Sequence, residues 1–257
     1  MPFTARPNAN IYWKHDGPDG APALILLNSI GTDMDLWDAM LPYLRPHLQL
    51  LRIDTRGHGA SDCVTGDIQL SDLAQDILAV ADAAGLSQFA IAGVSLGGMI
   101  AMEAALSAPD RLTALFPICT SATMDSASWD NRVATVRRDG MAAIADLAMG
   151  RFLSDQAEPA ITQAVRRQLL AMNAEGYAAC GTAIRDMDLS HRIQNIATPT
   201  LVISGTLDTS TPYEGHADYL VATIPNAQHQ ALEAAHLAPL EAPEALAQSI
   251  LQFMKAA

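Results

Sequence analysis

Short apolar runs alternate with stretches of helical periodicity along residues 1–120 of this chain. The runs Ala23 to Leu27 and Leu48 to Ile53 contain few polar side chains, which is typical of strands buried on both faces of a sheet. Each run opens into a polar or glycine-rich loop, and such loops lie where α/β sheets bind ligands. The alternation predicts an α/β fold, with a mostly parallel sheet flanked by helices.

The periodic segments predict the helices that cover this sheet. One helix is expected to have Ser71 as its N-cap, because a serine hydroxyl suits that position, and to end at Gly85. A strand at Phe89 to Ala92, a helix at Met99 to Ser107 and a strand at Leu115 to Cys119 are expected to follow.

The pattern changes near residue 121. From there to about residue 195 the sequence has helical periodicity and no convincing strand, and the alternation of strands and helices then resumes. We therefore expect residues 1–120 and 196–257 to form one α/β core, and residues 121–195 to form a helical lid inserted into it.

Composition argues against several classes of function. With 50% hydrophobic and 17% charged residues, the chain can bury a large core, and its net charge of −13 disfavours binding to nucleic acid or to anionic membranes. No apolar run approaches the roughly 18 residues of a spanning helix, and Met1 to Asn10 lacks the features of a secretory signal. We expect a cytoplasmic protein that is a monomer or a small homo-oligomer.

The spacing of the cysteines and of the possible metal ligands predicts neither a disulfide framework nor a metal site. Cys63, Cys119 and Cys180 are widely spaced and odd in number, so we expect buried, reduced thiols and no disulfide framework. No set of His, Cys and carboxylate residues has the spacing of a metal site, and we expect neither a metal nor an organic cofactor.

The segment Gly93 to Gly98 lies between a predicted strand and a predicted helix. A serine exposed on so sharp a turn crowds the neighbouring chain unless the residues two before it and two after it lack a Cβ atom. Gly93 and Gly97 meet that requirement, so Ser95 is expected to be a catalytic nucleophile.

A serine nucleophile needs a base, and the base needs an acid that holds its tautomer. Asp208 and His236 each follow one of the last two predicted strands, in the order serine, acid, histidine that goes with this turn. We predict a triad of Ser95, Asp208 and His236, with Asp125 as the alternative acid because related hydrolases sometimes place it after an earlier strand.

Most other histidines are expected at the surface, namely His15, His47, His191, His216 and His229. For His58 we expect an imidazole that ties down its own turn through hydrogen bonds, with a second catalytic base as the alternative.

The tetrahedral intermediate of acyl transfer needs two backbone N–H groups that face its oxyanion. One normally comes from the residue after the serine and the other from the loop after an earlier strand, which predicts Leu96 and Ile30.

With these residues in place, the chain resembles the α/β-hydrolase superfamily and, within it, the family of 3-oxoadipate enol-lactone hydrolases. The superfamily likeness rests on Asp54 to Ser61 and on Gly93 to Gly98. The likeness to the enol-lactone hydrolases rests on the segments Asn28 to Asp33 with Trp37, Trp129 to Arg132, Arg138 to Met141, Glu175 to Tyr177 and Ala234 to Leu237.

The resemblance implies that the chain opens the ring of 3-oxoadipate enol-lactone, a small anionic lactone, to give 3-oxoadipate in the bacterial breakdown of protocatechuate and catechol. Three alternatives stay open because one triad serves many chemistries on one fold. They are a carboxylesterase or a lactonase of another small substrate, a hydrolase of a carbon–carbon bond beside a ketone, and a sensor that keeps the triad to recognise a small ligand.

An acidic protein that binds an anionic substrate needs a local cation. Arg132 lies three residues after Trp129 on a predicted lid helix, so the two side chains share a face. We expect Arg132 to bind the substrate carboxylate and Trp129 to form an apolar wall beside it. The alternatives are an Arg132 that pairs with a surface carboxylate, and Arg137 or Arg138 as the substrate-binding cation.

Overall fold

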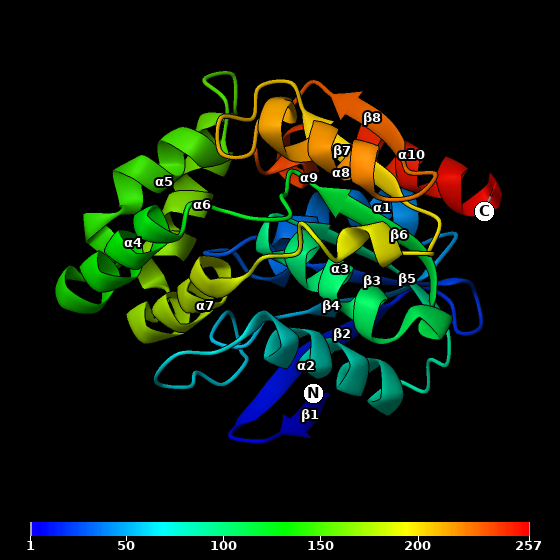
Figure 1. Cartoon of the computed structure of the whole chain (residues 1–257), viewed down its shortest axis with the longest axis horizontal. Helices are drawn as coiled ribbons and strands as arrows, with labels where there is room; N and C mark the ends of the chain where they lie inside the picture. The colour runs from blue at the N-terminus through cyan, green and yellow to red at the C-terminus, as the bar shows by residue number, and fades with distance from the viewer. Residues whose placement is uncertain (1, 257) are drawn as a thin grey trace.

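The computed structural model describes residues 2–256, and within them eight strands form one sheet (Figure 1). The strands lie in the order β1-β2-β4-β3-β5-β6-β7-β8. The pairs β1–β2 and β2–β4 are antiparallel and the remaining pairs are parallel, which confirms the predicted mostly parallel sheet. The strands are β1 (Phe3–Arg6), β2 (Ala9–Asp16), β3 (Ala23–Leu27), β4 (Gln49–Ile53), β5 (Phe89–Val94), β6 (Leu112–Ile118), β7 (Leu201–Gly205) and β8 (Gln228–Leu232).

Helices flank this sheet. They are α1 (Leu41–Leu44), α2 (Leu70–Ala83), α3 (Leu96–Ser107), α4 (Ser126–Asp139), α5 (Ala145–Phe152), α6 (Pro159–Ala171), α7 (Ala174–Asp186), α8 (Asp218–Thr223), α9 (Ala238–Glu241) and α10 (Pro243–Ala256). Helix α2 packs against α3, and α1 packs against α10. Among the helices of residues 2–256, none combines the length and the apolar character that a bilayer crossing needs.

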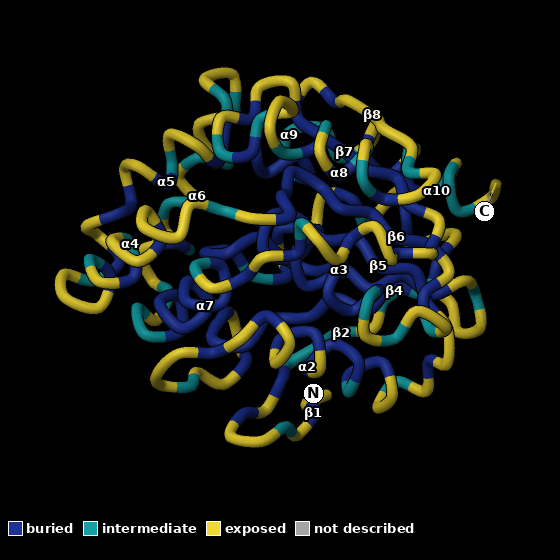
Figure 2. The backbone as a smooth tube through the Cα atoms, in the orientation of Figure 1, coloured by how far each residue is buried: buried dark blue, intermediate teal, exposed yellow. Residues whose placement is uncertain are grey.

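The core lies at the middle of the sheet. Every residue of β3 and β5 is buried, and Figure 2 shows the strands in dark blue inside a shell of partly exposed helices. The apolar run of β3 fits a strand that is covered on both faces. Because β3 to β8 run parallel, the loops that follow them meet at one edge of the sheet.

Helices α4 to α7 lie together at one side of the sheet (Figure 1). Helix α4 packs against α7, and α5 packs against α6. The group rests on the core through a contact of two glycines, since a Cβ on Gly57 would lie 2.7 Å from the Cα of Gly176 in α7. The segment predicted to be helical contains α4 to α7, and these helices contact the loop that follows β4.

Two expectations about the elements are wrong or incomplete. Helix α2 begins at Leu70, and its N-cap is Gln69 rather than Ser71: the Gln69 N–H donates to the carboxylate of Asp72, and the Asp72 N–H donates to the carbonyl of Gln69. The antiparallel strands β1 and β2 were not predicted. They lie at the edge of the sheet and are only partly buried, so they lack a long apolar run.

A third expectation, that all three cysteines are buried, is wrong for one of them. Cys119 and Cys180 are buried free thiols, as expected, but Cys63 is exposed. Cys63 lies in the polar loop after β4, where Asp62 beside it is also exposed, and the prediction of a buried thiol there is wrong.

Candidate active site

Ser95 occupies a strained turn between β5 and α3. Its backbone has φ 55° and ψ −116°, a conformation that a residue with a side chain rarely adopts. A Cβ on Gly93 would overlap the backbone of Gly97, and a Cβ on Gly97 would lie 2.5 Å from the carbonyl oxygen of Leu27. The two glycines therefore allow the close approach that the sequence predicted.

Neighbouring strands hold this turn in place. The Ser95 N–H donates to the carbonyl of Ile118 at 2.9 Å, and the Thr120 hydroxyl donates to the carbonyl of Ser95 at 2.7 Å. The Ser95 hydroxyl makes no hydrogen bond within residues 2–256, which is common before a substrate arrives.

Asp208 and His236 form a buried pair in the loops after β7 and β8. The Asp208 Oδ2 lies 3.0 Å from the His236 Nδ1, and both side chains are at most 2% exposed. Burial alone would raise the pKa of Asp208, but the facing imidazole and the bonds from Ser210 and Thr211 lower it to about 2. The carboxylate is therefore ionised at neutral pH and oriented toward the imidazole.

Asp125, the alternative acid, lies elsewhere. It is the N-cap of α4, where its side chain accepts the N–H of Ser128 at 2.7 Å, and it is exposed to solvent. The carboxylate that accepts a hydrogen bond from Nδ1 of His236 is that of Asp208 instead.

The loop after β3 forms a tight turn with a free donor. The Thr32 N–H bonds to the carbonyl of Ser29 at 3.2 Å, and Gly31 has φ 83°, as the third residue of a type II turn requires. Within residues 2–256 the N–H of Ile30 has no hydrogen-bond partner. Leu96 is the first residue of α3, so its N–H is free of the helical ladder.

Asn28, at the start of this loop, uses both ends of its side-chain amide. Its amide nitrogen donates to the carbonyl of Ile53 at 2.8 Å, and its amide oxygen accepts from the Trp37 indole at 3.1 Å. The side chain thus joins the ends of β3 and β4 below the turn.

Three aromatic or apolar side chains of the α4 to α7 group cover the site, and sequence reasoning missed their role. The Phe152 ring stacks on His236 with 6.1 Å between ring centroids. Leu169, Tyr177 and Phe152 all lie within 4 Å of the position of a Cβ built on Gly31. They come from α5, α6 and α7, so the apolar periodicity of those helices was the only signal in the sequence.

Arg132 and Trp129 lie together on α4, as predicted. The guanidinium carbon of Arg132 sits 4.6 Å from the centre of the Trp129 ring, and Trp129 is buried. Arg132 makes no ion pair with any residue of 2–256, whereas Arg137 is paired with Asp67 and Glu175.

Tyr177 lies close to this arginine. Its hydroxyl is buried and has no hydrogen-bond partner among residues 2–256. Burial raises the pKa of Tyr177, whereas the charge of Arg132 and the approach of its guanidinium to the phenol oxygen lower it, as does the charge of Arg151. A cation and an unused phenol donor therefore face the same region. Arg138, the other alternative cation, is bonded to Asp139.

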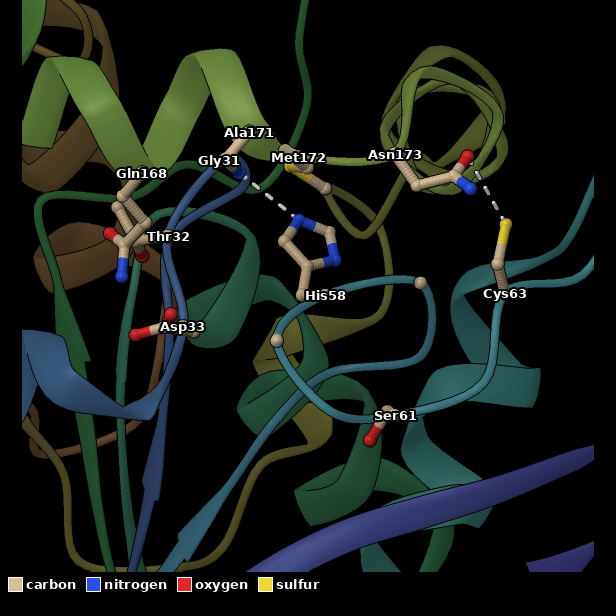
Figure 3. Close-up of a pocket in the computed structure, with 12 residues that line it drawn as sticks. Gly31, Thr32, Asp33, His58, Ser61, Cys63, Gln168, Ala171, Met172 and Asn173 are labelled. Atoms are coloured by element: carbon tan, nitrogen blue, oxygen red, sulfur yellow. Dashed lines mark hydrogen bonds between the residues drawn. The ribbon is translucent and has the colours of Figure 1, made fainter.

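His58 binds its surroundings as expected for an imidazole that fixes a turn. Its Nε2 accepts the N–H of Gly31 at 3.0 Å (Figure 3). Its Nδ1 lies 3.2 Å from the carbonyl of Arg56. It borders a cavity of about 590 Å³ at the junction of the core with α6. Burial lowers the pKa of His58 to about 4, so the ring is neutral at pH 7.

This pKa predicts a loss of stability in weak acid. Between pH 6.5 and about 4 the unfolded chain protonates His58 while the folded chain does not, so the free energy of unfolding falls as the pH is lowered through this range. Between pH 7.5 and pH 5, wild type should lose about 2 kcal/mol more than His58→Gln in urea unfolding. Asp54, whose pKa burial raises to about 6, has the opposite effect but is common to both proteins. Equal losses would contradict a neutral buried His58.

Comparison with known proteins places this site in a family. The alpha/beta hydrolase fold family matches residues 22–243, so the chain belongs to that family and is a hydrolase. The chain is 31% identical to 3-oxoadipate enol-lactonase 2 of Acinetobacter baylyi, over 93% of this chain and 91% of that protein. The crystal structure of the enol-lactonase from Burkholderia xenovorans LB400 matches with a TM-score of 0.95 and 29% identity, over 99% of this chain and all of that one.

An esterase is also similar. The chain is 28% identical to a pimeloyl-acyl-carrier-protein methyl ester esterase of Photobacterium profundum, over 95% of this chain and 98% of that protein. The chain is therefore a hydrolase, and it is similar both to enol-lactonases and to an esterase.

Proposed function

We propose that this protein is a serine hydrolase that opens the ring of 3-oxoadipate enol-lactone to give 3-oxoadipate, in the degradation of aromatic compounds through the protocatechuate or catechol branch. The observation that carries the choice of an anionic lactone is Arg132, a cation without a carboxylate partner in residues 2–256, which lies on Trp129 and faces the unused hydroxyl of Tyr177. The similarity to two enol-lactonases over nearly the whole chain supports the same choice.

In the first half of the reaction, Ser95 Oγ attacks the carbonyl carbon of the lactone while His236 takes the hydroxyl proton. Asp208 holds the imidazole in the required tautomer and stabilises its charged form. The N–H groups of Ile30 and Leu96 stabilise the oxyanion. The ring C–O bond then breaks, and the enol oxygen leaves with a proton from His236.

The second half releases the product. The enol rearranges to a ketone, which removes the leaving group from the equilibrium. His236 takes a proton from water, the resulting hydroxide attacks the acyl carbon, and Ser95 leaves with the proton returned by His236. The product is a keto diacid, and every step uses side chains and backbone of this chain.

The α4 to α7 group acts as a lid in this proposal, inserted as residues 121–195 between core segments 1–120 and 196–257. Its apolar side chains exclude water above His236, and Arg132 binds the carboxylate of the substrate through charge-assisted hydrogen bonds. The Tyr177 hydroxyl supplies a further donor, and Trp129 keeps the guanidinium in place.

Replacing Arg132 with alanine tests the substrate assignment. We expect kcat/KM for the enol-lactone to fall roughly tenfold to a hundredfold, the value of a charge-assisted hydrogen bond of about 1.5 to 3 kcal/mol. Hydrolysis of a neutral ester such as p-nitrophenyl acetate should be nearly unchanged, because that ester has no carboxylate.

Arg138→Ala is the matched control. Arg138 lies on the same helix, is exposed and is bonded to Asp139, so its loss should leave both activities close to those of wild type. Equal losses on the charged and the neutral substrate in Arg132→Ala would mean that Arg132 supports the lid and does not bind the carboxylate.

A carboxylesterase is the second candidate function, favoured by the similarity to the methyl ester esterase. A panel of neutral esters, neutral lactones and the enol-lactone separates the two. An esterase would prefer a neutral methyl ester. Arg132→Ala would then lower kcat/KM for no substrate selectively. A carbon–carbon bond hydrolase would cleave none of these with high efficiency, and a sensor would bind a ligand without sustained turnover.

A further inference from the structure

The turn that carries the Ile30 N–H is held by a residue from a different loop. Nε2 of His58, in the loop after β4, accepts the N–H of Gly31 at 3.0 Å, and both residues are buried (Figure 3). Figure 3 shows the imidazole pointing toward the turn, below the end of α6. The contact therefore joins the two loops beside the site.

Only one form of the imidazole satisfies both of its hydrogen bonds. The Arg56 carbonyl can only accept, so Nδ1 must carry the proton that it receives. In this tautomer Nε2 has no proton, so its lone pair can accept the N–H of Gly31. The low pKa of the buried ring agrees with this neutral form at pH 7.

The Gly31 N–H belongs to the middle peptide of the turn, which joins Ile30 to Gly31. In a type II turn this peptide faces opposite to its direction in a type I turn, and the difference between the two is largely a rotation of that one peptide unit. The bond from Thr32 to Ser29 closes both kinds of turn, so it does not select between them. The bond to His58 does select, because rotation of the peptide would turn the Gly31 N–H away from it.

The loop of His58 is in turn fixed by α7. The Cys180 thiol lies 3.2 Å from the same Arg56 carbonyl that Nδ1 faces, and the backbones of Gly57 and Gly176 are in close contact. The position of the imidazole therefore depends on the docking of the α4 to α7 group.

We propose that His58 is a positioning residue for the oxyanion hole: its Nε2 anchors the peptide between Ile30 and Gly31, and thereby holds in place the turn that carries the N–H of Ile30. This inference rests on the proposed serine mechanism but not on the identity of the lactone. His58 touches no reacting atom, so its effect is on the stabilisation of the oxyanion rather than on the binding of the substrate.

The test compares His58→Leu, which removes the acceptor, with His58→Gln, whose side-chain oxygen restores an acceptor at about the same reach. The substrate is p-nitrophenyl acetate, which needs an oxyanion hole but no carboxylate site. We expect His58→Leu to lower kcat roughly tenfold to a hundredfold with KM nearly unchanged, somewhat less than the loss of an oxyanion donor outright. His58→Gln should recover most of that activity.

A second readout separates positioning from a general loss of structure. A trifluoromethyl ketone adds to Ser95 Oγ and places an oxyanion where the intermediate has one, so its affinity should fall in His58→Leu by about the same factor as kcat/KM. The control is Thr182→Val, which removes a buried hydrogen bond of α7, from the Ile68 N–H to the Thr182 hydroxyl at 3.1 Å, and leaves the contacts of His58 in place. It should lower the melting temperature while keeping kcat within about twofold.

The outcomes are distinct. Unchanged kcat and ketone affinity in a folded His58→Leu would overturn the positioning role, and so would equal losses in Thr182→Val and His58→Leu. A wild-type enzyme that hydrolyses the ester but not the enol-lactone would overturn the proposed substrate alone. A wild-type enzyme that neither hydrolyses the ester nor binds the ketone would overturn the serine mechanism and this proposal with it.

Discussion

Ser95→Ala is expected to abolish hydrolysis while leaving the protein folded. Removing the nucleophile should lower kcat by up to roughly a millionfold, as in another serine hydrolase, because no neighbouring group can form the acyl intermediate. The change removes one hydroxyl that makes no hydrogen bond within residues 2–256, so the free energy of unfolding should change little. Steady-state rates on the enol-lactone and urea unfolding of both proteins measure the two effects.

Ser107→Ala is a suitable control because Ser107 lies at the other end of α3, where its hydroxyl bonds to the carbonyl of Glu103. It should retain the activity of wild type. Residual activity of Ser95→Ala above a few per cent, in a preparation free of wild-type enzyme, would show that Ser95 is not the nucleophile.

Asp208→Asn is expected to lower kcat by roughly ten-thousandfold, as for the acid of another serine hydrolase triad. The amide can donate a hydrogen bond to Nδ1 of His236, which favours the tautomer with its proton on Nε2. That nitrogen must accept the proton of Ser95, so the base is blocked even though the site keeps its shape. KM should change much less than kcat.

The control for the acid is Asp125→Asn. Asp125 caps α4 and is exposed, so its replacement should cost a small amount of stability and little activity. A large loss of kcat in Asp125→Asn together with a small loss in Asp208→Asn would show that the acid is Asp125 and not Asp208.

Most of the parallel part of the sheet could be predicted from the sequence because β3 to β7 are largely buried and consist mainly of apolar residues. The exposed strand β8 could be predicted only from its place in the alternation of strands and helices. The loops after those strands meet at one edge, so chain order alone predicts that Ser95, Asp208 and His236 share one site. The edge strands β1 and β2 lack that signal, since solvent reaches one side of them.

Contacts between distant segments could not be predicted from the sequence. The stacking of Phe152 on His236 and the placement of Tyr177 near Gly31 depend on how the α4 to α7 group docks, and the helical pattern shows only that these residues are apolar or face inward. For His58 the sequence indicated a turn held by an imidazole. Its partner Gly31 lies 27 residues away, and only the fold brings the two together.

The measurement that tests the account most directly is the turnover of 3-oxoadipate enol-lactone by wild-type protein, followed by the loss of its ultraviolet absorbance and by identification of the product. We expect sustained turnover, with kcat/KM above about 10⁴ M⁻¹s⁻¹ and 3-oxoadipate as the product. That value should exceed the kcat/KM for p-nitrophenyl acetate by a wide margin. Slower turnover of the enol-lactone than of the neutral ester would contradict the proposed function.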